Sequence, residues 1–410
     1  MRVGHGVAVL DVVPGEPMGG YADRAQGVGG VLDPLEVHAV TFADAGHRFA
    51  LVVADLVCVN VDAVARVRTA LRTVGVDSCW VVATHTHASP EAGCGPGGAA
   101  TPPHVAGRLE AASLAAARSA VATEQAARLS SARTLVPGLA SRRNVADPPP
   151  LDIPVDTVTV TVGTEVVGLV VVSPVHPTVL PADNNLVSAD LNGGIRRALS
   201  TQDRWVVVAT GAAGDISTRH TRQGRGLGEV DRLGIRVADR VGTPAPHPGG
   251  GSAPPVRPPV TRRVRLAPKP PAELAAALRQ APPPDTGDGR VRRVFDQGLR
   301  IAEEQAARGR TEPYLIDVEA VDLDGTTVVG VPGELFLELG EAIRASAEGV
   351  VVVGYANGYL GYLPARDTPP CYETHASPVS SGSGEIVVEA AVSAATEAAS
   401  GREPSRRTHV

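Results

Sequence analysis

The sequence predicts an α/β fold, in which a mixed central β-sheet is flanked by helices. Three observations predict this class. Short β-branched runs alternate with Ala-rich segments in the first third of the chain. A strand, a helix and a strand follow one another within residues 49–84, the order of a right-handed βαβ unit. Two β-branched runs, 156–162 and 166–172, are then joined by a short turn, as in a hairpin.

The individual elements follow from local patterns. Segment 49–55 is a continuous apolar run ending in an aspartate, as expected for a buried strand. Residues 62–74 have helical apolar spacing, and Asp62 can cap that helix. The other predicted strands are an opening strand at residues 1–7, then 79–84, 205–210 and 350–353, and a hairpin of 316–321 and 327–331. The other predicted helices are 103–131, 192–199, 290–307, a segment after Pro332, and 384–400.

Residues 1–400 are expected to form a single domain. The segment from about 241 to 287 is dense in Pro, Gly and Ala, which favours a surface excursion of that domain over a boundary between two domains. The last ten residues, 401–410, are expected to form a tail.

Composition excludes several classes of protein. No apolar run approaches the ~20 residues of a membrane-spanning helix, so an integral membrane protein is not expected. The opening residues lack the features of a secretory signal, which predicts a cytoplasmic location. The net charge of −6 and the pI near 6.0 argue against nucleic acid as the main partner. Neither nucleic acid nor a membrane interior is therefore an expected partner, and the sequence leaves the oligomeric state open.

Lysine and cysteine usage narrows the chemistry further. Lys269 is the one lysine of the chain, which argues against Schiff-base catalysis and against the phosphate-binding lysine of nucleotide-binding loops. The four cysteines, Cys58, Cys79, Cys94 and Cys371, are scattered along the chain. Their spacing predicts neither a disulfide framework nor a CxxC metal site.

Histidines follow two of the predicted strands. His85 and His87 come directly after strand 79–84, and in an extended segment they share one face. Such a pair can bind one metal ion together, or one histidine can bind while the other moves protons; both can also be ordinary polar loop residues. His176 follows strand 166–172 between Pro174 and Pro177, which hold its backbone stiffly. That setting suits a metal ligand, although for this histidine taken alone a buried structural histidine is the default interpretation.

Three later segments carry further polar candidates. Gly211 to Thr218 is a small-residue loop that contains Asp215 and Ser217, and it suits either a close backbone approach to a ligand or a helix cap. Glu334 stands where a strand leads into a helix, and the helix dipole would keep it ionised; it can also be a simple first-turn glutamate. A Tyr-rich region then offers metal ligands or oxyanion donors, or an aromatic core plug. Its tyrosines are Tyr355, Tyr359, Tyr362 and Tyr372.

Together, and in this order along the chain, these segments resemble the neutral/alkaline (non-lysosomal) ceramidase family. The segment from Met18 to Arg24 also resembles the glycine–tyrosine motif near the start of that family. The similarity runs from about residue 2 to 399. It implies a ceramidase-like catalytic domain, without the C-terminal immunoglobulin-like domain, that holds Zn²⁺ and hydrolyses an amide.

The resemblance also implies roles for individual residues. The zinc ligands would be two histidines, a carboxylate and a phenol: His85, His176, Glu334 and Tyr362. The catalytic or supporting positions would be His87, Asp215, Ser217 and Tyr372. The substrate-binding positions would be Arg142, Tyr359 and Thr178, and Tyr359 is also a possible ligand in place of Tyr362. The family motif GDxSPN departs at its end, where this chain has Thr218 and Arg219.

The expected function is therefore zinc-dependent hydrolysis of a linear, N-acyl type amide by a metal-activated water. Two alternatives use the same zinc site. One is an amide-forming or acyl-transfer enzyme of a biosynthetic pathway, and the other is a metal-binding homologue without turnover. A metal-free serine hydrolase is disfavoured, since the GxSxG pattern is missing around Ser217.

Overall fold

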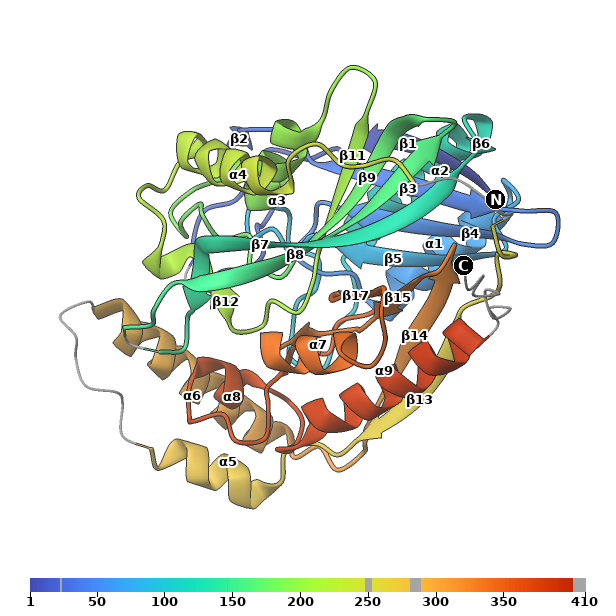
Figure 1. The fold of residues 1–410 in the computed structure, drawn as a ribbon. Coiled ribbons are helices and arrows are strands. Elements are labelled where there is room, and N and C mark those ends of the chain that lie inside the picture. The colour runs from blue at the N-terminus through green and yellow to red at the C-terminus, as the bar shows by residue number, and fades with distance from the viewer. Residues whose placement is uncertain (23, 146, 248–252, 281–288, 401–410) are drawn as a thin grey trace.

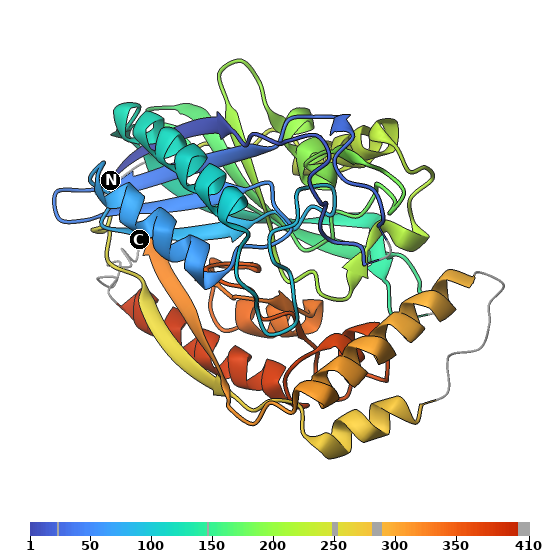
Figure 2. The same ribbon diagram turned by 180° about the vertical axis from the view of Figure 1, so that it is seen from behind.

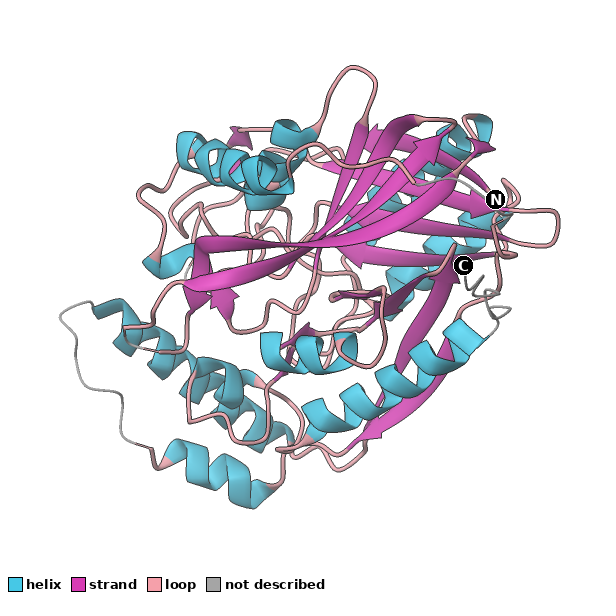
Figure 3. Cartoon of the chain, in the orientation of Figure 1, coloured by secondary structure: helices cyan, strands magenta, loops and turns pink. Residues whose placement is uncertain are grey.

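A computed structural model describes residues 1–22, 24–145, 147–247, 253–280 and 289–400. The predicted tail, 401–410, lies outside these residues. The chain has the expected α/β class, with helices and mixed sheets (Figures 1 and 3). Its strands are divided among three larger sheets and two short two-stranded ones.

The first sheet has the order β5-β4-β3-β1-β6. Its strands are β1 (Arg2–Val9), β3 (Glu36–Ala43), β4 (Arg48–Ala54), β5 (Ser78–Ala83) and β6 (Gln125–Ala126). Only the β4–β5 pair is parallel, and helix α1 (Val61–Arg72) connects these two strands, which confirms the predicted βαβ unit. Helix α2 (Pro103–Ala122) lies with α1 on the outer face of this sheet (Figure 2).

The second sheet has the order β11-β9-β8-β7-β12. Its strands are β7 (Arg128–Arg142), β8 (Leu151–Val162), β9 (Glu165–Ser173), β11 (Trp205–Thr210) and β12 (Ile216–Ser217). Here the parallel pair is β9–β11, joined through helix α3 (Asp190–Leu199). Helix α4 (Leu227–Val241) packs against α3.

The third sheet has the order β13-β14-β15-β17. Its strands are β13 (Val260–Leu266), β14 (Tyr314–Leu323), β15 (Thr326–Gly330) and β17 (Val350–Val353). Its parallel pair is β15–β17, and helix α7 (Leu337–Arg344) lies between these two strands in the chain. Helix α9 (Ser383–Ser400) packs against β13 and β14. The remaining elements are α5 (Pro271–Leu278), α6 (Gly289–Arg308), α8 (Tyr372–Ala376), the 3₁₀ turn η1 (Thr218–His220) and the short pairs β2 (Gly30–Val31)/β10 (Leu186–Val187) and β16 (Glu334–Leu335)/β18 (Tyr362–Leu363).

The three large sheets share one apolar core. Side chains from all three, such as Phe49, Trp80, Val160 and Val351, form a single buried cluster, while the opposite faces of the sheets are covered by helices. Because strands such as β4 are buried on both faces, they are continuous apolar runs in the sequence, without the alternation of a half-exposed strand.

Two boundaries differ from the sequence prediction. The helix predicted over 103–131 ends at Ala122, and the long strand β7 begins at Arg128. The Pro/Gly-rich segment 241–287 contains β13 and α5 in its described part. Strand β13 has the sequence VTRRVRL, whose three arginines interrupt the apolar pattern of a strand. Val264 and Leu266 are buried, while Arg262 pairs with Glu397 of α9.

The parallel pair in each large sheet determines where the site can lie. The strands of such a pair end at the same edge, so the segments that follow them converge. His85 and His87 follow β5, His176 follows β9, and Glu334 follows β15. Among the described residues, none of the helices combines the length and apolarity needed to cross a bilayer.

Helices α3 and α4 cross at two glycines, which makes their packing testable. A Cβ atom on Gly234 would lie 2.3 Å from backbone atoms of Gly194, so Gly234→Ala must separate the helices. We expect a loss of about 1–3 kcal/mol in the free energy of unfolding, measured by urea denaturation. Gly228→Ala is the matched control on the same helix, because nothing lies within 4 Å of that Cβ position, and it should not destabilise. Equal stability of the two variants would contradict the close crossing.

Candidate metal centre

Two histidines and a glutamate meet in the interior, at the ends of strands from three sheets. His85, His176 and Glu334 are each at most 2% exposed. Their closest atoms are His85 Nε2 to His176 Nε2 at 3.2 Å, Glu334 Oε2 to His85 Nε2 at 3.3 Å, and Glu334 Oε2 to His176 Nε2 at 3.0 Å. His87 joins them, with its Nε2 3.3 Å from that of His85.

Backbone carbonyls determine which ring nitrogens are protonated. His85 Nδ1 lies 2.6 Å from Val57 O, and His176 Nδ1 lies 2.5 Å from Ala213 O. A carbonyl oxygen only accepts hydrogen bonds, so both Nδ1 atoms donate, and the Nε2 atoms of the neutral rings carry lone pairs. A carbonyl partner on the far nitrogen is the usual arrangement of a metal-binding histidine.

The glutamate is held in the same way. Tyr359 donates its hydroxyl to Glu334 Oε1 at 2.5 Å, which leaves Oε2 facing the two imidazoles. Within the described residues Oε2 accepts no hydrogen bond. Three groups that can each offer a lone pair therefore converge on one point, and a cation held there would relieve the repulsion between them.

The spacing also fits a cation. Tetrahedral Zn²⁺ with bonds of about 2.0–2.1 Å places its ligand atoms roughly 3.3 Å apart. The three separations among His85, His176 and Glu334 are 3.0–3.3 Å. His85, His87 and His176 by themselves form a group that could hold a metal ion. The residues present thus suit a divalent metal with nitrogen and oxygen ligands.

Burial keeps these histidines in the form that binds metal. Burial, with a further contribution from Arg143, lowers the pKa of His176 to about 3. Burial, together with the neighbouring His85 and His176, lowers the pKa of His87 well below its usual range. Both rings are therefore neutral near pH 7, as a ligand or a proton acceptor must be.

Unusual backbone conformations cluster at this place. His85, Asp190, Tyr355 and Asn357 have positive φ angles of 64°, 51°, 55° and 61°. Residues other than glycine adopt this region at a cost, and such strain is concentrated at functional sites. The Asp190 carboxylate accepts backbone hydrogen bonds from Val179 and Leu180, and so fixes the loop that carries His176.

A cavity of about 720 Å³ opens beside this cluster. Five residues singled out in the sequence line it: His87, Thr178, Ser217, Tyr362 and Tyr372. Ser217 Oγ also caps the turn η1 by accepting from the Arg219 amide at 3.3 Å. Tyr372 packs edge-on against Tyr362, with ring centres 5.7 Å apart.

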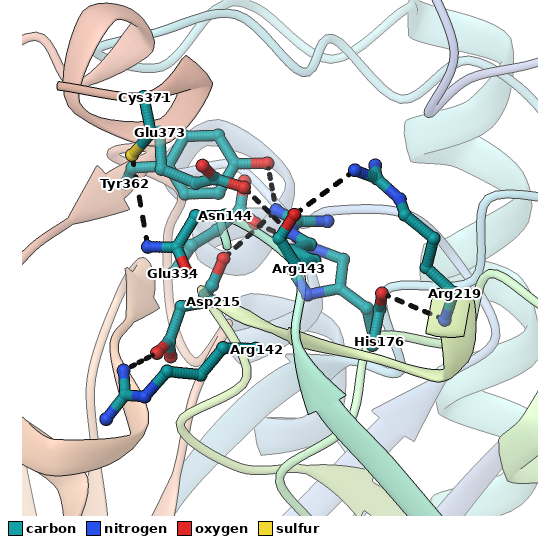
Figure 4. A network of polar contacts seen from close by, with 12 residues as sticks. Arg142, Arg143, Asn144, His176, Asp215, Arg219, Glu334, Tyr362, Cys371 and Glu373 are labelled. Carbon is teal, nitrogen blue, oxygen red and sulfur yellow. Dashed lines mark hydrogen bonds and ion pairs between the residues drawn. The ribbon is translucent and has the colours of Figure 1, made fainter. Parts of the chain in front are cut away.

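The structure gives Arg142 and Arg143 different positions (Figure 4). Arg142 forms an ion pair with Asp215, and neither of these two is among the described residues that line the cavity. Arg143 does line it, and is buried with its Nε 2.8 Å from Glu373 and one Nη 2.8 Å from the Tyr362 hydroxyl. Neighbours at the end of a strand point to opposite sides, which explains why one arginine faces the site and the other faces away.

Asp215 has both carboxylate oxygens engaged. One meets Arg142, and the other accepts the Leu337 amide at 2.8 Å, at the start of α7. Burial, only partly offset by the Leu337 amide and Arg142, raises the pKa of this carboxyl. This geometry ties the loop after β11 to the segment that carries Glu334, and it gives Asp215 a supporting position.

The tyrosines divide into two groups. Tyr359 touches Glu334, whereas the Tyr362 hydroxyl is held by Arg143. Burial, with the nearby charge of Glu334, raises the pKa of Tyr359 well above 10, so this phenol stays protonated and donates. Whether Tyr362 or Tyr359 completes the metal coordination stays a prediction.

Sequence reasoning did not assign roles to several residues of the site. Tyr355 stacks on His85 with ring centres 4.1 Å apart, and Tyr21 packs edge-on against His87 at 4.8 Å. Arg143 and its partner Glu373 were also not assigned. Tyr21 lies in the glycine–tyrosine motif and Tyr355 in the Tyr-rich region, but their contacts depend on loops that meet only in the folded chain.

One prediction about the cysteines was wrong. Cys58 and Cys94 form a disulfide, while Cys79 and Cys371 are free and buried. The pairing joins two loops that are 36 residues apart in the chain, so spacing alone could not reveal it. The bond lies next to Val57, whose carbonyl orients His85. Disulfides are typical of oxidising compartments, which counts against the predicted cytoplasmic location.

Two solved structures resemble the chain over nearly its whole length. One, described as neutral ceramidase from Pseudomonas aeruginosa, matches with a TM-score of 0.71 and 18% identity, covering 97% of this chain and 74% of that one. The other, described as ceramidase complexed with C2, gives a TM-score of 0.71 and 16% identity, covering 96% and 74%.

The chain has the neutral ceramidase fold. This confirms, at the level of the fold, the resemblance drawn from the sequence motifs. No protein-family model and no curated protein matches the sequence. Identities of 16–18% establish the ceramidase fold alone, so the chemistry must be argued from the residues of the site.

The metal centre makes a direct prediction. His176→Ala removes one of the three converging donors, and bound metal should fall at least about tenfold relative to the wild type in elemental analysis. His104→Ala is the matched control, since His104 is 59% exposed and pairs with Glu16, and it should keep its metal. Equal metal content in both variants would show that the three groups do not form the site.

Proposed function

We propose that the protein is a zinc-dependent hydrolase of carbon–nitrogen bonds in linear, N-acyl type amides. The observation that carries the proposal is the convergence of His85 Nε2, His176 Nε2 and Glu334 Oε2 within 3.0–3.3 Å of one another, beside a cavity large enough for a small molecule. The ceramidase fold supports the choice of an amide as the bond that is cleaved.

His85, His176 and Glu334 would hold the ion, with Tyr362 as the proposed fourth protein ligand. A divalent zinc ion in this position would supply Lewis acidity toward the amide carbonyl and would lower the pKa of a water molecule to about 7. Tyr359 keeps the Glu334 carboxylate in place through its hydrogen bond to Oε1.

His87 is positioned to move the proton. Its ring lies between the ligand cluster and the cavity, and its Nε2 is 3.3 Å from that of His85. A neutral imidazole there can accept a proton from the attacking water at Nε2 and deliver it to the leaving nitrogen. Its backbone is fixed by Arg24, which donates to the His87 carbonyl oxygen at 2.7 Å.

The developing negative charge on the carbonyl oxygen needs donors on the cavity side. Tyr372, the Tyr362 hydroxyl and backbone amides near Ser217 are the candidates, and Arg143 adds a buried positive charge beside them. Loss of one such donor typically costs about 3–4 kcal/mol of transition-state stabilisation. Asp215 and Arg142 act through position, by holding the loop after β11 against α7.

The proposal predicts that amide hydrolysis depends on the metal. It also predicts that replacing His87 lowers turnover without lowering the metal content. The purified protein should release free amine from members of an N-acyl amide panel, and a chelator should abolish that release. In His87→Ala, kcat should fall by roughly 10²–10⁴ while elemental analysis still finds the wild-type metal content.

Several outcomes would contradict this account. Turnover that survives complete removal of metal would refute metal dependence, and a lack of turnover by the metal-loaded protein across the panel would refute hydrolysis. Loss of metal together with activity in His87→Ala would make His87 a ligand, not the proton carrier. Adding amine acceptors to the same assay separates hydrolysis from acyl transfer.

A further inference from the structure

The cavity beside the metal centre is lined by an unusual number of arginines. Arginines outnumber carboxylates six to three among the described residues that line it. The arginines are Arg143, Arg219, Arg222, Arg225, Arg293 and Arg300, and the carboxylates are Asp183, Asp296 and Glu373. Two of these carboxylates already pair with arginines: Glu373 with Arg143, and Asp296 with Arg292, which is not a lining residue.

The arginines belong to two separate walls of the cavity. One wall is the segment after β12, where Arg219 and Arg222 donate to the carbonyl oxygens of Arg143 and Thr178 and so are held at the cavity. Arg219 occupies the last position of the motif that departs from the ceramidase pattern. Arg225 follows on the same segment.

The other wall is helix α6. Arg293 and Arg300 are seven residues apart, with Gln297 between them, which places all three on one face of the helix. Arg225, Arg293 and Arg300 are exposed, and none of the ion pairs found among the described residues includes them. Their positive charges are therefore available to a ligand.

Branched aliphatic side chains are scarce in this lining. Apart from alanine, glycine, proline and the tyrosines, the described lining residues include one aliphatic side chain, Val294. Pockets for long alkyl chains are lined predominantly by aliphatic and aromatic side chains. Guanidinium groups instead match carboxylate and phosphate oxygens with paired hydrogen bonds.

We propose that the amide substrate carries an anionic group, a carboxylate or a phosphate, which the arginines of the segment after β12 and of α6 bind while the amide lies at the metal centre. This inference rests on the proposed amidase function and names its substrate class. It distinguishes this chain from an enzyme for uncharged lipid amides, because selectivity would come from charge on the cavity walls.

The test compares three amides with the same acyl chain and different amine parts. N-hexanoylglycine carries a carboxylate, N-hexanoyl-O-phosphoethanolamine a phosphate, and N-hexanoylethanolamine no charge. With the metal-loaded full chain, kcat/KM for at least one anionic amide should exceed that for the neutral one by about tenfold or more. Raising the salt concentration should reduce this preference, since exposed charges are screened.

Variants of α6 identify the source of the preference. The double variant Arg293→Gln/Arg300→Gln should raise KM for the anionic amide roughly tenfold and leave the neutral amide unchanged. Arg308→Gln is the matched control on the same helix, because Arg308 pairs with Glu304 and is not a lining residue of the described cavity. It should behave as the wild type with all three amides.

The outcomes separate this inference from the proposed function. If kcat/KM for the neutral amide equals that for both anionic amides, the proposed substrate class is wrong, while amide hydrolysis stands. If no amide is cleaved, calorimetric titration with N-hexanoylglycine decides: binding that the double variant weakens about tenfold supports the anion site alone. If that binding is absent or unchanged in the double variant, the inference fails. The carboxylate and phosphate arms show which anion is preferred.

Discussion

Three buried lone pairs, from two imidazoles and one carboxylate, face the same point in the interior, and the surrounding structure serves to keep them there. Burying a carboxylate away from water is costly unless it is paired, and Glu334 is 1% exposed with one oxygen directed at the two imidazoles. The carbonyl oxygens of Val57 and Ala213 and the hydroxyl of Tyr359 hold all three groups in this orientation. A cation held between the three groups would stabilise this arrangement.

The same strand arrangement in each large sheet brings the two histidines and the glutamate together. Each large sheet contains a single parallel pair, β4–β5, β9–β11 or β15–β17, and the site residues follow the ends of these strands. Close backbone contact completes the arrangement, since a Cβ on Gly214 would lie 2.4 Å from the carbonyl oxygen of Glu334. The loop after β11 can therefore lie directly against the strand that carries the glutamate.

The parts of the site that local sequence predicts are those set by strand ends. His85, His176 and Glu334 each lie within a few residues of the end of an apolar run, so strand ends marked all three as candidates, and the family resemblance then assigned them as ligands. The βαβ unit at 49–84 follows from the same apolar runs. Contacts between distant loops left no such pattern. The side of the chain on which Arg143 lies, the stacking of Tyr355 on His85, and the Cys58–Cys94 disulfide all depend on the relative placement of the sheets.

Elements with mixed patterns were missed for a related reason. Strand β7 contains Pro137 and a register shift, and β13 alternates arginines with apolar residues, so neither resembles the buried strands that the sequence revealed. The arginines of α6 could not be assigned to the site from the sequence either. In the sequence they belong to an ordinary charged helix, and only the folded chain places Arg293 and Arg300 on a cavity wall next to the metal centre.

The most direct measurement of the central claim is anomalous X-ray diffraction from crystals of the protein, recorded on both sides of the zinc absorption edge. The account predicts one strong peak in the difference map, within bonding distance of His85 Nε2, His176 Nε2 and Glu334 Oε2. Zinc-supplemented crystals without a peak between these three atoms, or with the bound metal elsewhere in the molecule, would contradict it.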